Sequence, residues 1–354
     1  MMLLRGIALL LAVGGVAPPP QDEVVIRTTT SLVEVRVVVE DKDQNPIANL
    51  ERSNFEILDN SQPRPIRLFA AYRGPNPPPL KSGADAEDAS TSTSPTPSEY
   101  ALIVLDWMNT DYEGRVRVQE ELLKLLADFE PRQWLGIYVL SKVKSGMLSE
   151  FTHDRNLLSF LVRGMSLDPG EMTGRVRRGG LGGPGGPRRD GTFVSSPAND
   201  LAFFQASHQT VDTTLALEMI AEHMVKIPGR KTLIWISDGT PLVVGGSYFS
   251  AYSEPAIHKL NISDTAVYVM GPPQKGHDLS KDEFSRRTGG AYIHSNEVEK
   301  SMRKALEDTE ISYTLGFHLP EGAKPGLHGI VVKVNVPHGK LRYRESYDPY
   351  PAFH

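Results

Sequence analysis

Hydrophobic residues follow two different patterns along this chain. Near both ends they form short runs of strand length, separated by turn-forming residues. In the middle, continuous apolar runs such as residues 101–106 alternate with stretches in which apolar residues recur at helical spacing. Alternating strands and helices predict a doubly wound, mostly parallel α/β sheet over residues 100–310, flanked by β segments at residues 24–72 and 311–347.

The two β segments are predicted to form one unit. The first offers about four strands and the second about three, whereas an immunoglobulin-like sandwich needs roughly seven. Neither piece alone buries enough surface to be stable. Because chain ends usually lie close together and insertion at a loop is tolerated, we expect one discontinuous immunoglobulin-like β-sandwich with the α/β domain inserted into it.

Two further segments have little to bury. Residues 73–99 are rich in Pro, Ser, Thr, Ala and Asp, which is typical of a flexible linker. Residues 170–200 are dominated by Gly and Pro and read as a disordered insertion in the α/β domain. The insertion also carries a set of arginines, namely Arg175, Arg177, Arg178, Arg188 and Arg189. An RNA-binding tract would interleave aromatic residues with them, so no nucleic-acid partner is expected.

The first residues have the pattern of an export signal. Arg5 precedes a short apolar run and then small residues, which predicts a signal peptide over residues 1–17 and an exported protein, periplasmic or extracellular. The apolar run is too short to span a bilayer, and no other long one follows, so no transmembrane segment is expected in the mature chain. Pro18 is unfavourable just after a cleavage site, which leaves an uncleaved N-terminal anchor as the alternative.

Composition narrows the classes of function. The net charge of −5 is too small to indicate nucleic acid or a membrane surface as partner. The absence of cysteine excludes disulfides, thiolate metal sites and a cysteine nucleophile. The chain contains no G-x-S-x-G, H-E-x-x-H or P-loop motif, so we expect a protein that is not an enzyme. An unrecognised hydrolase is the less favoured alternative.

Acids follow two of the predicted buried strands. Asp106 ends the run "ALIVLD", and Asp238 ends "KTLIWISD". Ligands of open parallel sheets bind at the carboxyl ends of the strands, where the strand order reverses. Thr110, one turn beyond Asp106, could add a hydroxyl oxygen for a hard cation. The alternatives without an ion are a helix cap at Thr110 or Asp111 and a turn after the second strand.

Several stretches resemble a known family. The stretches "IVLDWMNT" and "TLIWISDG", with the α/β order, resemble a von Willebrand factor type A (VWA) domain. Outside the linker and the insertion, nearly the whole chain is similar to exported VWA-related proteins common in acidobacteria. The stretches that carry this wider resemblance are "VVEDKDQNPIANLERSNFEILDNSQPRPI", "IPGRKTLIWISDG", "RRTGGAYIHS" and "YTLGF" with the strands after it.

The resemblance implies a metal-ion-dependent adhesion site. In the family this site consists of a D-x-S-x-S motif together with a threonine and an aspartate from two further loops. Met108 stands where the first serine is expected, and a thioether is a poor ligand for Mg²⁺ or Ca²⁺. Thr213 is the preferred second-loop threonine, ahead of Thr210. The matched positions are Asp106, Thr110, Thr213 and Asp238.

The function implied is that of an exported protein–protein interaction module, an adhesion module or scaffold, with a degenerate ion site. The ion would be Mg²⁺, or Mn²⁺ or Ca²⁺, and a carboxylate of an unknown partner protein would complete its coordination. The alternative is a metal-independent structural scaffold on the same fold. No organic cofactor is expected.

Overall fold

The central strands are continuous apolar runs because helices cover the sheet on both faces. Six strands form one sheet in the order β12-β11-β8-β5-β6-β7, and all neighbours are parallel except β6 and β7. The prediction of an α/β domain with a mostly parallel sheet is thus confirmed. The strands are β5 (Tyr100–Asp106), β6 (Trp134–Leu140), β7 (Gly146–Thr152), β8 (Lys231–Ile236), β11 (Thr265–Gly271) and β12 (Tyr292–His294).

This computed structural model describes residues 32–42, 45–73, 100–128, 133–141, 145–167, 197–227, 229–238, 243–244, 247–248, 250–271, 279–295, 297–307, 311–320 and 322–350. The predicted signal peptide, nearly all of the predicted linker and most of the predicted insertion lie outside these residues. None of the helices in the described ranges combines the length and the hydrophobicity that crossing a bilayer requires.

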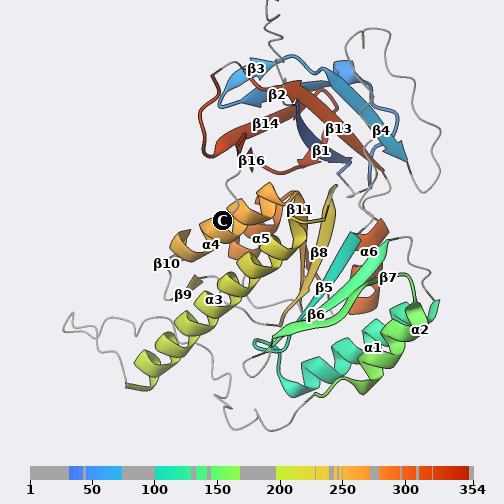
Figure 1. The fold of residues 1–354 in the computed structure, drawn as a ribbon, viewed down its shortest axis with the longest axis vertical. Coiled ribbons are helices and arrows are strands. Elements are labelled where there is room, and N and C mark those ends of the chain that lie inside the picture. Colours follow the sequence, from blue (N-terminus) through green and yellow to red (C-terminus); the bar gives the residue numbers. More distant parts are fainter. Residues whose placement is uncertain are drawn as a thin grey trace, which may run out of the picture. The chain divides into compact units, whose positions relative to one another are not determined.

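Helices cover the two faces of the sheet in two groups (Figure 1). One core cluster joins the sheet to α1, α2 and α6, and a second joins it to α3, α4 and α5. α1 presents an apolar stripe to the strands, as Val118, Leu122 and Leu125 show by being fully buried. The helices are α1 (Tyr112–Asp128), α2 (Arg155–Gly164), α3 (Pro197–Met224), α4 (Ser250–Ile262), α5 (Leu279–Arg287) and α6 (Val298–Glu307).

Helix ends follow local chemistry. Asp154 caps α2, since its carboxylate accepts hydrogen bonds from the backbone of Asn156 at 2.9 Å and of Leu157 at 3.0 Å. Helix α3 begins at Pro197. Proline suits the first turn of a helix, where its missing N–H would have no partner and its φ is already helical.

Strands from both ends of the chain build a β unit of two four-stranded sheets, ordered β15-β1-β13-β4 and β16-β14-β2-β3. In Figure 1 the blue strands of the N-terminal segment lie beside the red strands of the C-terminal segment. The strands are β1 (Leu32–Glu40), β2 (Phe55–Asp59), β3 (Gln62–Arg64), β4 (Leu68–Arg73), β13 (Ile311–His318), β14 (His328–Val334), β15 (Lys340–Arg342) and β16 (Ser346–Tyr347). A 3₁₀ turn (Arg52–Asn54) precedes β2. Strands β9 (Val243–Val244) and β10 (Ser247–Tyr248) form a separate two-stranded sheet.

One hydrophobic core fills the space between the two sheets. Val35 of β1 lies opposite Leu315 of β13, and both are fully buried. The ring of Tyr313 packs against Phe55 at 5.2 Å and against Phe69 at 6.0 Å between centroids. Residues far apart in the chain therefore share this core. The immunoglobulin-like strand order stays a prediction.

Lys231 is a buried cation at the start of β8. The residue is only 3% exposed, and its Nζ donates a hydrogen bond to the carbonyl oxygen of Ile227 at 2.8 Å. Burial lowers the pKa of this ammonium group from its usual 10.5 to about 8, against the attraction of Asp264, which raises it.

We expect the free energy of unfolding to rise from pH 8 to pH 10. In that range the unfolded lysine, with its pKa near 10.5, binds more protons than the folded one, with its pKa of about 8, so stability increases with pH. The rise is on the order of 2 kcal/mol. Urea unfolding across this range measures it, and Lys231→Met should give a nearly flat profile. An equally steep rise in that variant would contradict the assignment.

Candidate functional site

The strand order reverses between β5 and β8. The chain continues from β5 to β6 on one side, while β8 pairs with β5 on the other, with Leu105 opposite Ile236. The carboxyl ends of these two strands therefore flank the position where open α/β sheets bind ligands. The side chains gathered there are called the rim residues below, and they are Asp106, Asn109, Thr110, Thr213 and Asp238.

Asp106 lies fully buried at the end of β5. Its Oδ1 accepts hydrogen bonds from the backbone N of Asn109 at 3.1 Å and from Asn109 Nδ2 at 2.9 Å. Its Oδ2 accepts from Asn109 Nδ2 at 2.8 Å and from Trp235 Nε1 at 3.1 Å. A buried carboxylate needs such donors, because burial without them would disfavour its charge.

Thr213 reaches the same point from α3. Its Oγ1 accepts a hydrogen bond from Asn109 Nδ2 at 3.0 Å and lies 3.9 Å from the sulfur of Met108. The amide nitrogen of Asn109 therefore sits among three oxygens, two from Asp106 and one from Thr213. The other threonine considered, Thr210, is also buried, but its carbonyl oxygen accepts a bond from Thr214 within α3.

Asp238, in contrast to Asp106, is held by a cationic side chain, that of Arg117. Its two carboxylate oxygens lie 3.3 and 3.2 Å from Nη2 of Arg117 on α1, and its backbone N donates to Thr110 Oγ1 at 3.4 Å. Gly114 permits this approach, because a Cβ there would lie 2.1 Å from Asp238 Oδ2. The structure thus joins Asp106 with Thr213 through Asn109, and Thr110 with Asp238 through a backbone N–H.

Several contacts hold the loop between β5 and α1. Buried Arg115 donates to the carbonyl oxygen of Thr110 at 2.9 Å and to that of Trp107, and the backbone N of Met108 donates to Leu140 O at 3.0 Å. Asp111 caps α1, since its Oδ1 accepts from the backbone N of Gly114 at 2.8 Å. Of the two residues considered as helix caps, Asp111 therefore caps α1, whereas the hydroxyl of Thr110 accepts a hydrogen bond from the backbone of Asp238.

As arranged, the rim residues do not fit a divalent ion. The position among the oxygens of Asp106 and Thr213 is taken by an N–H donor, which cannot coordinate a cation, and the carboxylate of Asp238 is paired with Arg117. No group of three His, Asp or Glu side chains suited to a metal occurs in the described part of the chain. The nearby sulfur of Met108 is a poor ligand for hard cations.

Sequence reasoning missed the residues that hold the two acids. Asn109 follows Asp106 by three positions, and this spacing is a usable signal, because short polar side chains often bond to nearby backbone and side-chain groups. Arg117 and Trp235 carried no such signal. Both lie on elements whose contact with the rim depends on how the sheet and α1 pack together.

Comparisons with known proteins give only a weak likeness in fold. No protein-family model matches the chain, and no curated protein does. A von Willebrand factor type A structure from Catenulispora acidiphila is 8% identical, covers 72% of this chain and 66% of its own, and has a TM-score of 0.37. Proximal thread matrix protein 1 from the mussel byssus is 10% identical with a TM-score of 0.34.

The mussel match covers 61% of this chain, which spans about half (49%) of the mussel protein's length. The human COPII-coat protein Sec24c is 12% identical, with a TM-score of 0.32 over 72% of this chain and 44% of its own. All three of these TM-scores are below 0.5.

Proposed function

We propose that this protein is a non-enzymatic binding module whose rim recognises a carboxylate of a partner protein without a metal ion. The observation that carries the proposal is the ion pair between Arg117 and Asp238 at the carboxyl end of β8. It places a positive charge next to the reversal point of the sheet, which is where α/β proteins bind their ligands.

Arg117 has donors left for a partner. Asp238 engages only Nη2, and the arginine side chain is 41% exposed, whereas the Asp238 side chain is 11% exposed. A guanidinium group presents paired N–H donors that match the two oxygens of a carboxylate. Asp238 orients the group, and the partner's acid binds its exposed edge.

Asn109 explains how the rim keeps its shape without an ion. Its amide links Asp106 on β5 to Thr213 on α3 through bonds of 2.8 to 3.0 Å. An ion would otherwise make the same link between the loop and the helix. The rim is therefore pre-organised, which reduces the entropy that binding must overcome. The alternative is a structural scaffold in which this network only holds the fold together.

Selection of a random display peptide library on the purified chain tests the binding proposal. We expect acid-containing peptides whose affinity falls about tenfold or more in Arg117→Gln, because that change removes the recognising charge. The matched control is Arg52→Gln, another exposed arginine, in the β unit. Acidic peptides that bind Arg117→Gln as tightly as the wild type would contradict recognition at the rim and favour the scaffold.

A further inference from the structure

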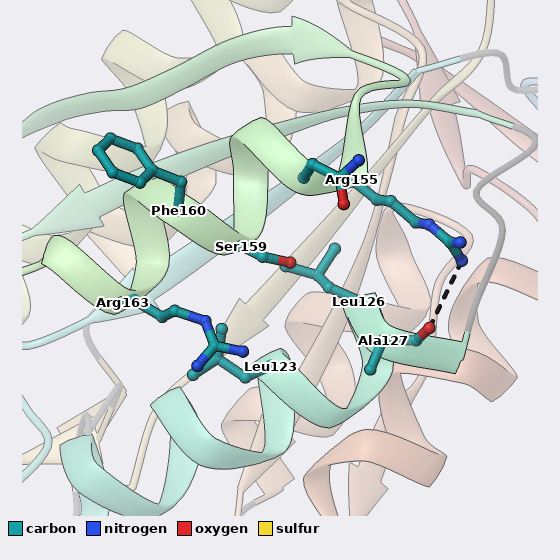
Figure 2. A pocket seen from close by; sticks show the side chains of 8 residues that line it. Leu123, Leu126, Ala127, Arg155, Ser159, Phe160 and Arg163 are labelled. Carbon is teal, nitrogen blue, oxygen red and sulfur yellow. Dashed lines mark hydrogen bonds between the residues drawn. The ribbon is translucent and has the colours of Figure 1, made fainter.

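A groove runs between α1 and α2, apart from the rim residues (Figure 2). Its volume is about 440 Å³. α1 contributes Leu123, Leu126 and Ala127, and α2 contributes the other side, with Ser159 at its middle. The lining residues are Leu123, Leu126, Ala127, Arg155, Asn156, Ser159, Phe160 and Arg163.

Apolar side chains remain exposed along this groove. Phe160 is 73% exposed, although phenylalanine is among the residue types most often buried. Leu123 on the facing helix is half-buried. Covering this exposed apolar surface with an apolar side chain of a partner would be favourable.

The charges of the groove have one sign. Among the described residues that line the groove, Arg155 and Arg163 are the charged ones, and none is an acid. They lie eight positions apart on α2, which a helical rise of 1.5 Å per residue places roughly 12 Å apart along the axis. Arg155 Nη1 donates to the carbonyl oxygen of Ala127 at 3.4 Å, a weak contact with a neutral group. No ion pair joins either arginine to another described residue.

We propose that this groove binds an acidic segment of a partner protein that carries at least one large apolar side chain. The apolar side chain packs beside Phe160 and over Leu123, which buries an aromatic anchor of the type that dominates binding interfaces. Acids on either side of it reach Arg155 and Arg163, which sets the orientation of the segment.

Other anionic surfaces match the groove less well. Clusters that bind anionic lipid typically contain about four to eight basic residues, whereas the described lining of this groove includes two, Arg155 and Arg163. Glu120 and Asp128 are exposed on α1 and would repel a flat anionic membrane or a nucleic-acid backbone. A peptide can place its few acids at the arginines and avoid both carboxylates.

Peptides selected from a random display library on the full chain test this inference. We expect a class that combines acids with Phe, Leu or Ile and that loses affinity about tenfold or more in Phe160→Ser. The double change Arg155→Gln with Arg163→Gln should weaken the same peptides, and their affinity should then depend less on salt. Arg52→Gln and Arg117→Gln should leave this class unaffected, which separates the groove from the rim.

Two results would overturn the inference. One is selected peptides that bind Phe160→Ser and the double variant as tightly as the wild type. The other is a wild-type chain that dimerises in sedimentation experiments and becomes monomeric in Phe160→Ser, because a second copy would then be the occupant. Phe160 and Arg163 are exposed, and half-buried Arg155 makes only the weak contact with Ala127, so both variants should fold, and unchanged thermal unfolding verifies that they do.

Discussion

A chain that lacks residues 311–354 should lose the structure of its N-terminal β segment. The deletion removes β13, which lies between β1 and β4, and β14, which lies between β16 and β2. Among the described strands, β1 pairs only with β13 and β15, so the deletion would remove both of these partners. The deletion also removes the core side chains that fill the space between the sheets, namely Tyr313, Leu315, Phe317, Ile330 and Val332.

Amide hydrogen exchange of Val35, Val37 and Val39 measures this effect. All three lie in β1, and each is at most 1% exposed. In the truncated chain their protection should fall to that of an unfolded segment, since isolated strands without a covered face are not stable. A chain that lacks only residues 351–354 is the matched control. Protection kept at its full-length level after the long deletion would show two independent β units.

The single change Asn109→Asp should convert the rim into a site whose stability depends on a divalent ion. It replaces the amide nitrogen, which lies 2.9 and 2.8 Å from the oxygens of Asp106, by a carboxylate oxygen. Two buried carboxylates at that distance repel each other, and Asp106 also loses its amide donor. Without ions we expect the free energy of unfolding to fall by about 3 kcal/mol.

A divalent ion should reverse this loss. The new carboxylate, Asp106 and Thr213 would then offer three hard oxygens around one point, which Mg²⁺, Mn²⁺ and Ca²⁺ favour. Urea unfolding with a chelator and with millimolar ion measures the stabilisation, and calorimetric titration measures the binding. The wild type should respond to neither, and the control Asn335→Asp, at an exposed position, should behave like the wild type.

Two outcomes would contradict this account of the rim. The first is a wild-type chain that binds the ion with measurable heat and is stabilised by it. The ion would then displace the amide of Asn109, and the rim would be a metal-ion-dependent site. If Asn109→Asp loses stability but no ion restores it, the oxygens of Asp106 and Thr213 are not placed to coordinate a cation. In either case the proposed role of Arg117 would still be tested by its own variant.

The sequence by itself determined the class of the α/β domain and the location of the rim. The run from Ala101 to Leu105 has no polar position, so it had to be buried on both faces, and that requires a sheet covered by helices. Hydrophobic periodicity is a local property, and the predicted strands and helices depend on it directly. An acid at the end of such a strand, like Asp106, must then lie at the carboxyl edge of the sheet.

Only the tertiary structure decided what the rim residues do. Whether Asp106 faces an ion or an amide depends on where Asn109, Thr213 and Trp235 meet, and these come from a loop, a helix and another strand. The pairing of Asp238 with Arg117 likewise depends on how α1 packs against the sheet beside Gly114. Except for the pair of Asp106 and Asn109, these contacts join residues more than a hundred positions apart, and hydrophobic patterning carries no information on side-chain partners at that separation. A carboxylate that could bind a cation is therefore visible in the sequence, whereas the protein group that occupies the cation's place appears only when the chain is folded.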